Sequence, residues 1–249
     1  MMKKENQNLE FVAARLEGLE ETIISRLIDR AQFHVNSSVY LAGKSGFSGE
    51  PSRSLFEIRM QYQENMDALF GRFCVPEERP FTRNLPSPRR AVILEETGLN
   101  ILNFDKVNLS SEILTDYFDL ITKLCQPSDD GQYGSSVEHD IYALQAIARR
   151  IHYGAMYIAE CKYSSSTDLL NQLIENNDYN GMMSALTRKD VEDRIITRIR
   201  EKTIAAQVSI NELVRYRIDP EIVVKFYRDT IIPLTKKGEI AYLLNRRRN

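Results

Sequence analysis

The chain has 249 residues and contains no tryptophan, only three histidines and only three cysteines. The cysteines, Cys74, Cys125 and Cys161, are odd in number and far apart in the sequence. This usage fits a reduced compartment and indicates neither a disulfide framework nor the ligand spacing of a zinc site. The histidines are dispersed as well, so the sequence predicts neither a metal site nor a Ser/His catalytic triad.

Long apolar runs and a large excess of charge are also absent. No stretch approaches the 18 apolar residues of a membrane-spanning helix, and the opening "MMKKENQNLE" lacks the apolar centre of a secretion signal. A formal net charge of −2 gives no electrostatic reason to bind nucleic acid or an anionic membrane. We therefore expect a cytoplasmic protein that binds neither, and in which any anion site is local.

The common catalytic motifs are missing too. The chain contains no G-x-S-x-G, no H-E-x-x-H and no C-x-x-C. The stretch "SVYLAGKS" ends like a phosphate-binding loop, but Ser38 stands where the first glycine should be and no apolar strand precedes it. We interpret this stretch as a plain turn, and the sequence indicates neither covalent nor metal chemistry.

Helix-period patterns dominate the chain, and no convincing strand with a two-residue period occurs. Helices are predicted over about residues 7–34, 53–73, 91–97, 110–125 and 167–176, and a long one runs from the start of "SSVEHD" through Tyr163. Capping residues predict four helix starts, namely Ser135 with Glu138, Asp178, Thr187 with Asp190, and Asp219 with Pro220. Pro233 is expected to kink the last helix. The sequence thus predicts an all-α, single-domain helical bundle with long helices over residues 1–249.

Two cations stand on faces of the long helix that otherwise look buried. An apolar stripe that starts at Val137 and advances by steps of four and three lands on Lys162. A second stripe, which passes through Ile147, lands on Arg150. The neighbouring Arg149 shares its face with polar residues and should point outward. The pattern therefore puts Arg150 and Lys162 on the inner side of the helix.

Two later helices repeat this anomaly with the opposite charge. Glu192 shares a stripe with Ile195, and Thr235 and Glu239 lie one turn apart on an apolar face. An unpaired buried charge is costly, so such groups normally have a partner. Either they form an internal ion-pair network, or they line a pocket for a polar anionic ligand. Composition and periodicity leave both possibilities open.

Three segments carry a family resemblance: "RRIHYG…AECKY", "VEDRI" and "IIPLTKKGEIAYLL". In this order they resemble the all-helical chorismate mutases of the fungal and plant type. The likeness extends to "LEETIISRLIDRAQF", "SSVY" and "GRFCVPEERPF", and so covers most of the chain. It implies a chorismate mutase II-like fold and an isomerase of phenylalanine and tyrosine biosynthesis. That enzyme converts chorismate to prephenate by a [3,3] rearrangement and uses no cofactor.

The resemblance also implies a role for each inward polar residue. Arg150 matches an arginine that grips a substrate carboxylate, and Thr235 matches a threonine at that carboxylate end. Lys162 matches the lysine that donates to the breaking ether oxygen, and Glu192 matches the acid that orients the ring hydroxyl. Glu239 matches a glutamate at the ether oxygen, to which it can donate only when protonated; burial would favour that form.

The family's first helix carries a second carboxylate-binding arginine, but this chain has Ala13 at that position. Arg15 is nearest in sequence, although two residues turn it about 200° away around the helix. Arg188 replaces a small polar residue of the family pattern. Either Arg15 or another cation such as Arg188 supplies the missing charge, or the site has lost much of its affinity.

A further departure concerns spacing along the long helix. Arg150 and Lys162 are twelve residues apart, whereas the family spacing is eleven. Eleven residues bring two side chains within about 20° on an ideal helix, and twelve set them about 120° apart. A one-residue π-bulge around 154–157 would restore the alignment, and we predict one there.

Fungal members of the family are inhibited by tyrosine and activated by tryptophan at a dimer interface. Of that effector site this chain keeps Arg72, Gly134 and Ser135, while Glu138 stands in place of a threonine. The segment before the last helix also looks shorter than in regulated members. This partial match favours loss of effector control.

The leading hypothesis is an active, homodimeric chorismate mutase with each site inside one subunit. An enzyme of altered specificity is one alternative, because of Ala13 and Arg188. A catalytically impaired paralogue that serves as a regulatory or interaction subunit is the other.

Overall fold

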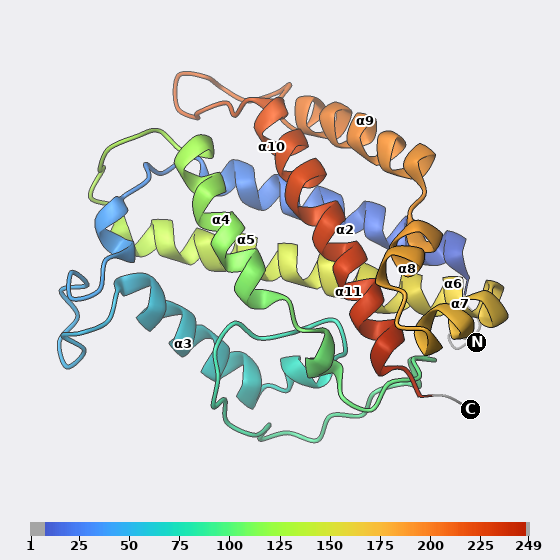
Figure 1. Cartoon of the computed structure of the whole chain (residues 1–249). Helices are drawn as coiled ribbons and strands as arrows, with labels where there is room; N and C mark the ends of the chain where they lie inside the picture. The colour runs from blue at the N-terminus through green and yellow to red at the C-terminus, as the bar shows by residue number, and fades with distance from the viewer. Residues whose placement is uncertain (1–7, 248–249) are drawn as a thin grey trace.

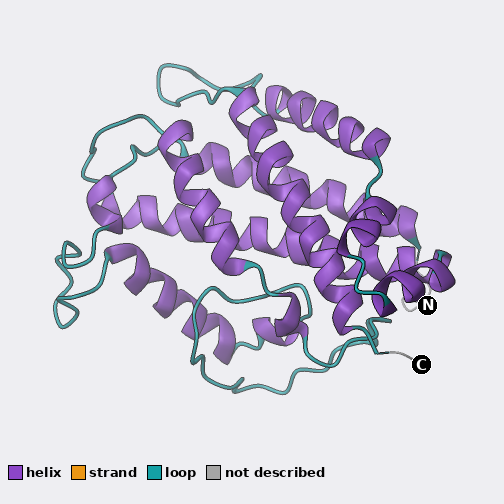
Figure 2. Ribbon diagram, viewed as in Figure 1, coloured by secondary structure: helices purple, strands orange, loops and turns teal. Residues whose placement is uncertain are grey.

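The computed structural model describes residues 8–247, and within that range it contains helices and no strand (Figure 2). This confirms the predicted all-α class. No helix among the described residues is long and apolar enough to cross a membrane. The only β-type pairing in residues 8–247 is an isolated bridge between Ile101 and Arg246.

The α-helices are α2 (Leu9–Arg30), α3 (Leu55–Leu69), α4 (Ser110–Leu124), α5 (Tyr133–Tyr153), α6 (Ala159–Ser165), α7 (Thr167–Glu175), α8 (Tyr179–Leu186), α9 (Lys189–Ala205), α10 (Pro220–Phe226) and α11 (Ile232–Asn245). Two π-turns join helices end to end: η4 (Gly154–Ile158) between α5 and α6, and η5 (Tyr227–Ile231) between α10 and α11. Short 3-10 turns cover Ser37–Tyr40, Arg72–Cys74 and Phe104–Val107.

The α5–η4–α6 rod forms the axis of the molecule (Figure 1). Helix α2 packs along it, α3 and α4 pack against α5, and α11 packs on η4. Helix α9 contacts both α2 and α10, so it closes the bundle above the α10–η5–α11 rod. Buried apolar side chains form one cluster among α2, α4, α5 and α10, and a second around η4, α6 and α11.

A buried ion pair ties α2 to α5 within the first cluster. The Arg30 Nε donates to Asp140 Oδ1 at 2.5 Å, and both side chains are fully buried. Tyr40 and Tyr117 donate their hydroxyls to the same carboxylate at 2.7 and 2.8 Å. Since every polar partner is satisfied, this network fixes the register of α2 on α5.

Helix boundaries agree with the predictions where side-chain caps form. Asp178 accepts from Gly181 N, and Asp219 caps α10 with Pro220 at its first position, as predicted. The Ser135–Glu138 capping box is wrong, because α5 already begins at Tyr133 and Glu138 pairs with Arg59 instead.

Two further predictions about helix starts and content are wrong. The Thr187 hydroxyl donates back to the Met183 carbonyl at 2.7 Å, so it completes α8 instead of capping α9. Residues 91–97 are not helical. Their side chains have no buried face to pack, as the 94 % exposure of Ile93 illustrates.

The predicted first and second helices extend further than the observed ones. Helix α2 ends at Arg30 and α3 at Leu69, just before Gly71 adopts a positive φ of 84°. Residue 7, the predicted first residue, lies outside the described range. The sequence predicted a kink at Pro233, and the structure has the π-turn η5 there, which ends two residues before the proline. In a regular helix the ring of Pro233 would clash with the preceding turn, and the π-turn avoids that clash.

Candidate active site

Arg150 lies at the end of α5 with its side chain turned into the bundle, as its stripe predicted. It is 2 % exposed, and its Nη1 donates to Thr235 Oγ1 on α11 at 2.9 Å. The guanidinium carbon lies 5.8 Å from the ring centre of Tyr227, on η5. Its Nε is buried and donates to no described group. The site therefore contains a buried cation whose Nε–H can still donate a hydrogen bond.

Lys162 reaches the same region from α6. Its Nζ donates to Glu239 Oε2 at 2.8 Å and to the Leu186 carbonyl at 2.5 Å. Glu239 is 3 % exposed and lies one turn beyond Thr235 on α11. The two cations of the rod thus meet two neighbouring polar groups of one facing helix.

The π-turn η4 occupies residues 154–158, where the sequence predicted a bulge. Each π-turn accommodates one extra residue, so it rotates Lys162 back toward the face of Arg150. This finding confirms that the rod is not a regular helix between the two cations.

Two glycines allow α11 to approach the π-turn closely. A Cβ on Gly154 would lie 2.8 Å from Thr235 Cγ2. A Cβ on Gly238 would lie 2.5 Å from the Ala155 Cβ. Both contacts are too short for real carbon atoms, so glycine at these positions sets the spacing between the two walls of the site.

Glu192 lies on α9, and its carboxylate pairs with Lys236 on α11 at 3.0 Å. The sequence did not predict a role for Lys236, because Lys236 follows Thr235 by one residue and so points about 100° away from it around the helix. The second lysine of "LTKKGE" was a signal that more than one cation stands near the inward Thr235 and Glu239.

Comparisons with known proteins bear on the family of the chain. No protein-family model matches the chain. The chain is 35 % identical over 248 residues to a chorismate mutase of Schizosaccharomyces pombe, and the match covers 97 % of each protein. Its fold matches the chorismate mutase of Candida albicans in complex with L-Trp, with a TM-score of 0.88, 33 % identity and coverage of 98 % and 93 %. The chain belongs to the chorismate mutase family.

A third similar protein is AtCM1, solved with phenylalanine in its allosteric site. The TM-score is 0.86 at 33 % identity, and the match covers 96 % of each chain. Relatives of this chorismate mutase fold therefore bind aromatic amino acids at a regulatory site.

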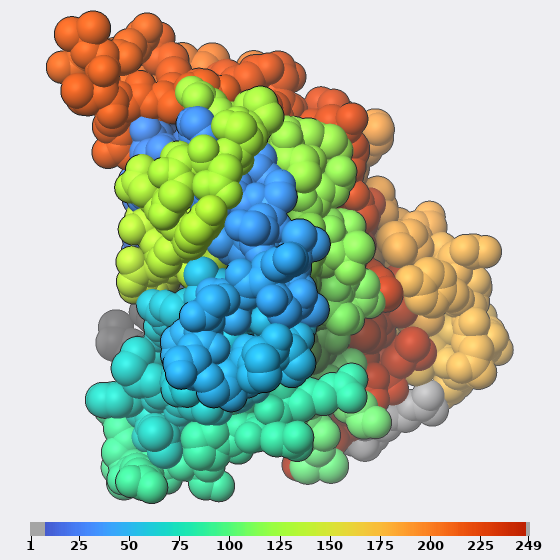
Figure 3. Space-filling view, turned by 90° about the vertical axis from the view of Figure 1, so that its left-hand side faces the viewer, coloured from blue at the N-terminus to red at the C-terminus, as the bar shows by residue number. Residues whose placement is uncertain are grey.

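The effector residues expected from the family resemblance are not adjacent within one chain. Gly134 and Ser135 are exposed in the first turn of α5, whose yellow-green surface is visible in Figure 3. Arg72 donates instead to Gln145 at 2.6 Å, ten residues further along α5, or about 15 Å at the helical rise. Asp67 and Glu78 also hold Arg72, at 3.0 and 2.8 Å.

The two arginines named for the cation missing at Ala13 pair with carboxylates other than Glu192 and Glu239. Arg15 lies 5.0 Å from the ring centre of Tyr153 and 3.9 Å from Glu77. Arg188 pairs with Asp190 and is largely exposed. It is two residues from Leu186, whose carbonyl accepts from Lys162.

Burial dominates the electrostatics of Glu239. Desolvation raises the pKa of its carboxyl to about 7, and the nearby Lys162 only partly offsets this. Oε2 is used by Lys162, whereas Oε1 makes no hydrogen bond to a described residue. Near neutral pH the Glu239 carboxyl is therefore present both in its ionised form, which accepts hydrogen bonds, and in its protonated form, which can donate one.

The close packing of α11 on η4 can be tested with matched glycine variants. Gly154→Ala should lower the free energy of unfolding by about 1–3 kcal/mol, because the new methyl group overlaps Thr235. Gly134→Ala has nothing within 4 Å and should leave stability unchanged or raise it by up to about 1 kcal/mol. Urea unfolding measures both, and equal effects at the two positions would contradict the packing argument.

Proposed function

We propose that the chain is an active chorismate mutase, which isomerises chorismate to prephenate at the site between the α5–η4–α6 rod, α9 and α11. One observation carries the proposal: Arg150 and Lys162 both lie on the inner side of the rod, and the buried Arg150 Nε has no partner within residues 8–247. An internal ion-pair network would have paired that group. An anionic guest pairs it instead.

Each polar group then has a task in the rearrangement. Arg150 and Thr235 bind one carboxylate of the substrate and so hold it in the reactive, folded conformer. Lys162 and the protonated Glu239 donate to the ether oxygen as its bond breaks and negative charge develops there. Glu192, supported by Lys236, orients the ring hydroxyl. These donors are fixed before the substrate arrives, so their alignment costs little in the transition state.

Turnover of chorismate by the purified protein tests this function, and two neighbouring arginines provide the internal control. Arg150→Ala should reduce kcat/KM by at least about 10³-fold, since it removes a buried carboxylate clamp. Arg149→Ala should change it little, because Arg149 pairs with Glu78 on the outer face. A wild-type protein that forms no prephenate would favour the non-enzymatic regulatory or interaction subunit.

The raised pKa of Glu239 predicts a pH profile. The protonated form donates to the ether oxygen and is lost as pH rises through about 7, so kcat should fall about tenfold per pH unit above that value. Glu239→Gln keeps a donor at every pH and should flatten the decline. Rates measured from pH 5 to 9 decide this, and a wild-type profile that is flat above neutrality would reject the assignment.

We also propose that Arg188 swings inward to bind the second substrate carboxylate in place of the arginine missing at Ala13. Arg188→Ala should then raise KM about tenfold, the effect of losing one charge-assisted contact. Arg194→Ala is the matched control, because Arg194 pairs with the same Asp190 on the same helix. Ala13→Arg should rescue the Arg188→Ala variant. Equal KM values for the two alanine variants would point to Arg15 or to altered specificity.

We infer from the family resemblance that the protein is a homodimer with weak effector control. An exposed apolar stripe at the end of α3, formed by Tyr62, Met66 and the C-cap residue Phe70, supports a second copy as partner. Phe70→Glu should produce monomers at concentrations where the wild type is dimeric by light scattering, whereas Leu169→Glu, at an exposed apolar residue of α7, should not. A wild-type monomer would contradict the inference.

A further inference from the structure

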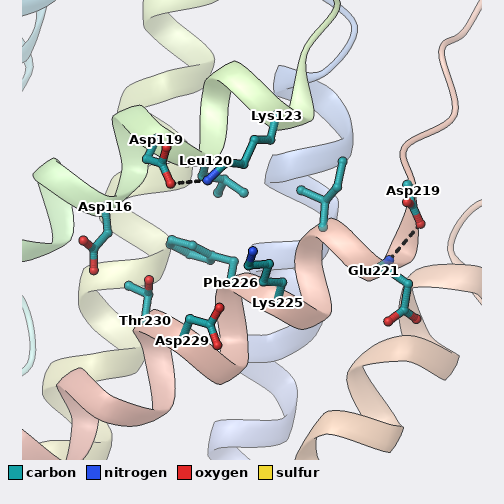
Figure 4. Close-up of a pocket in the computed structure, with 11 residues that line it drawn as sticks. Asp116, Asp119, Leu120, Lys123, Asp219, Glu221, Lys225, Phe226, Asp229 and Thr230 are labelled. Atoms are coloured by element: carbon teal, nitrogen blue, oxygen red, sulfur yellow. Dashed lines mark hydrogen bonds and ion pairs between the residues drawn. The ribbon is translucent and has the colours of Figure 1, made fainter.

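The polar groups at the two ends of the α10–η5–α11 rod are paired in different ways. At the α10 end they line a surface groove of about 290 Å³ (Figure 4). There Asp119 pairs with Lys123 of the same helix, and Asp219 caps the first turn of α10. At the α11 end the paired groups instead come from three segments that are far apart in the sequence. The second arrangement therefore fixes helices relative to one another.

Glu160 of α6 is the centre of this second network. It is 4 % exposed, and the Arg246 guanidinium donates to both of its carboxylate oxygens, at 2.8 and 2.9 Å. Tyr242 of α11 donates its hydroxyl to Oε2 at 2.6 Å, and the Asn100 side chain donates to Oε1 at 2.7 Å. Burial alone would raise the pKa of the Glu160 carboxyl, but these hydrogen bonds outweigh burial and hold the pKa below its usual range. The group is therefore an ionised carboxylate at neutral pH.

Backbone contacts hold the end of α11 where this network forms. Arg246 is the C-cap residue of α11, and it takes part in the isolated bridge with Ile101. The Arg247 N–H donates to the Asn100 carbonyl at 2.7 Å, and the Asn100 N–H donates to the Tyr242 hydroxyl oxygen at 2.8 Å. The end of α11 is thus tied to the loop around Asn100 as well as to α6.

Arg246 contacts α6 on both sides of Lys162. It pairs with Glu160, two residues before the lysine, and its guanidinium carbon lies 3.7 Å from the ring centre of Tyr163, the residue after it. Helix α6 has seven residues and follows the π-turn η4, so no regular helix continues from α5 to set its rotation. Contacts between α6 and its neighbours must therefore set the direction in which Lys162 points.

We propose that the Glu160–Arg246 pair fixes the rotation of α6 and so aims Lys162 into the proposed active site. Both members are positioning residues, because they act through the lysine. The side chains around the pair are otherwise largely apolar, and apolar contacts have no preferred direction. A buried ion pair adds little stability over apolar residues of the same size, but its two parallel hydrogen bonds form in one geometry alone. The pair thus supplies the orientation that apolar packing does not.

The consequence for turnover rests on the proposed function, in which Lys162 and Glu239 donate to the ether oxygen. Arg150 and Thr235, which bind the substrate carboxylate, are held by a separate hydrogen bond between α5 and the start of α11. Loss of the positioning pair should therefore lower kcat and leave KM nearly unchanged.

The rate at which acetic anhydride acetylates Lys162, followed by mass spectrometry, tests the aim of the lysine without turnover. Glu160→Met combined with Arg246→Met replaces the pair by two apolar side chains, so the unfolding temperature should stay within about 5 °C of the wild type. At pH values above 7, where Glu239 is largely ionised, Lys162 is held by that carboxylate in the wild type. In the double variant Lys162 should react about tenfold faster, because it loses the carboxylate that favours its charged, unreactive form.

Two further variants complete the test. Arg247→Met is the matched control, since Arg247 is exposed and contacts Asn100 through its backbone, and it should react as the wild type does. Arg246→Lys keeps the charge but loses the two-point contact, so Lys162 should react about threefold faster, and this milder variant decides the matter if the double variant does not fold. Acetylation of the exposed Lys44 calibrates the reagent in every sample.

Kinetics with chorismate then test the consequence of the misaimed lysine. The kcat of the double variant should fall about tenfold with KM within about twofold of the wild type, and Arg246→Lys should retain more of the kcat. Acetylation of Lys162 that is unchanged in both variants, or equally fast in Arg247→Met, would overturn the proposal whether or not chorismate is converted. Faster acetylation with an unchanged kcat would overturn it as well. Faster acetylation in a protein that converts no chorismate would support the positioning of Lys162 and reject the proposed function instead.

Discussion

The burial of Arg150 on the inner side of a helical rod is the constraint on which the rest of this structure depends. A buried guanidinium loses its hydration, and that loss must be offset by hydrogen bonds or by a counter-charge. The protein supplies one neutral acceptor, Thr235, and one aromatic face, Tyr227, and it leaves the Nε unpaired. One donor of Arg150 thus has no acceptor among the described residues, and the proposed substrate would supply one through its carboxylate.

Bringing a second cation to the same place requires an irregular helix. Lys162 would be turned away from Arg150 on a regular helix, but the π-turn η4 corrects the rotation. The turn is held by close packing, since Gly154 and Gly238 let α11 approach it and the carbonyl of Leu186 accepts from Lys162. The contacts that hold η4 therefore also shape the site.

The sequence predicted the features that depend on helical period and missed those that depend on tertiary contacts. Stripe counting separated the inward Arg150 from the outward Arg149. The π-turn η4 was predicted by comparing the twelve-residue spacing with the eleven of the family that the sequence resembles. The capping box at Ser135 was wrong because α5 begins two residues earlier, at Tyr133, and Glu138 pairs with Arg59. Lys236 was missed because its pairing with Glu192 joins two helices far apart in the sequence.

Ligand-induced stabilisation tests the central claim most directly, because it asks only whether the buried cations await a dianion. Thermal unfolding of the wild type should shift to higher temperature as prephenate is added, in proportion to the logarithm of its concentration above Kd. A singly charged analogue that lacks one carboxylate should give a clearly smaller shift. An unfolding temperature that does not respond to prephenate would show that Arg150 and Lys162 serve only the folded structure, and would contradict the account.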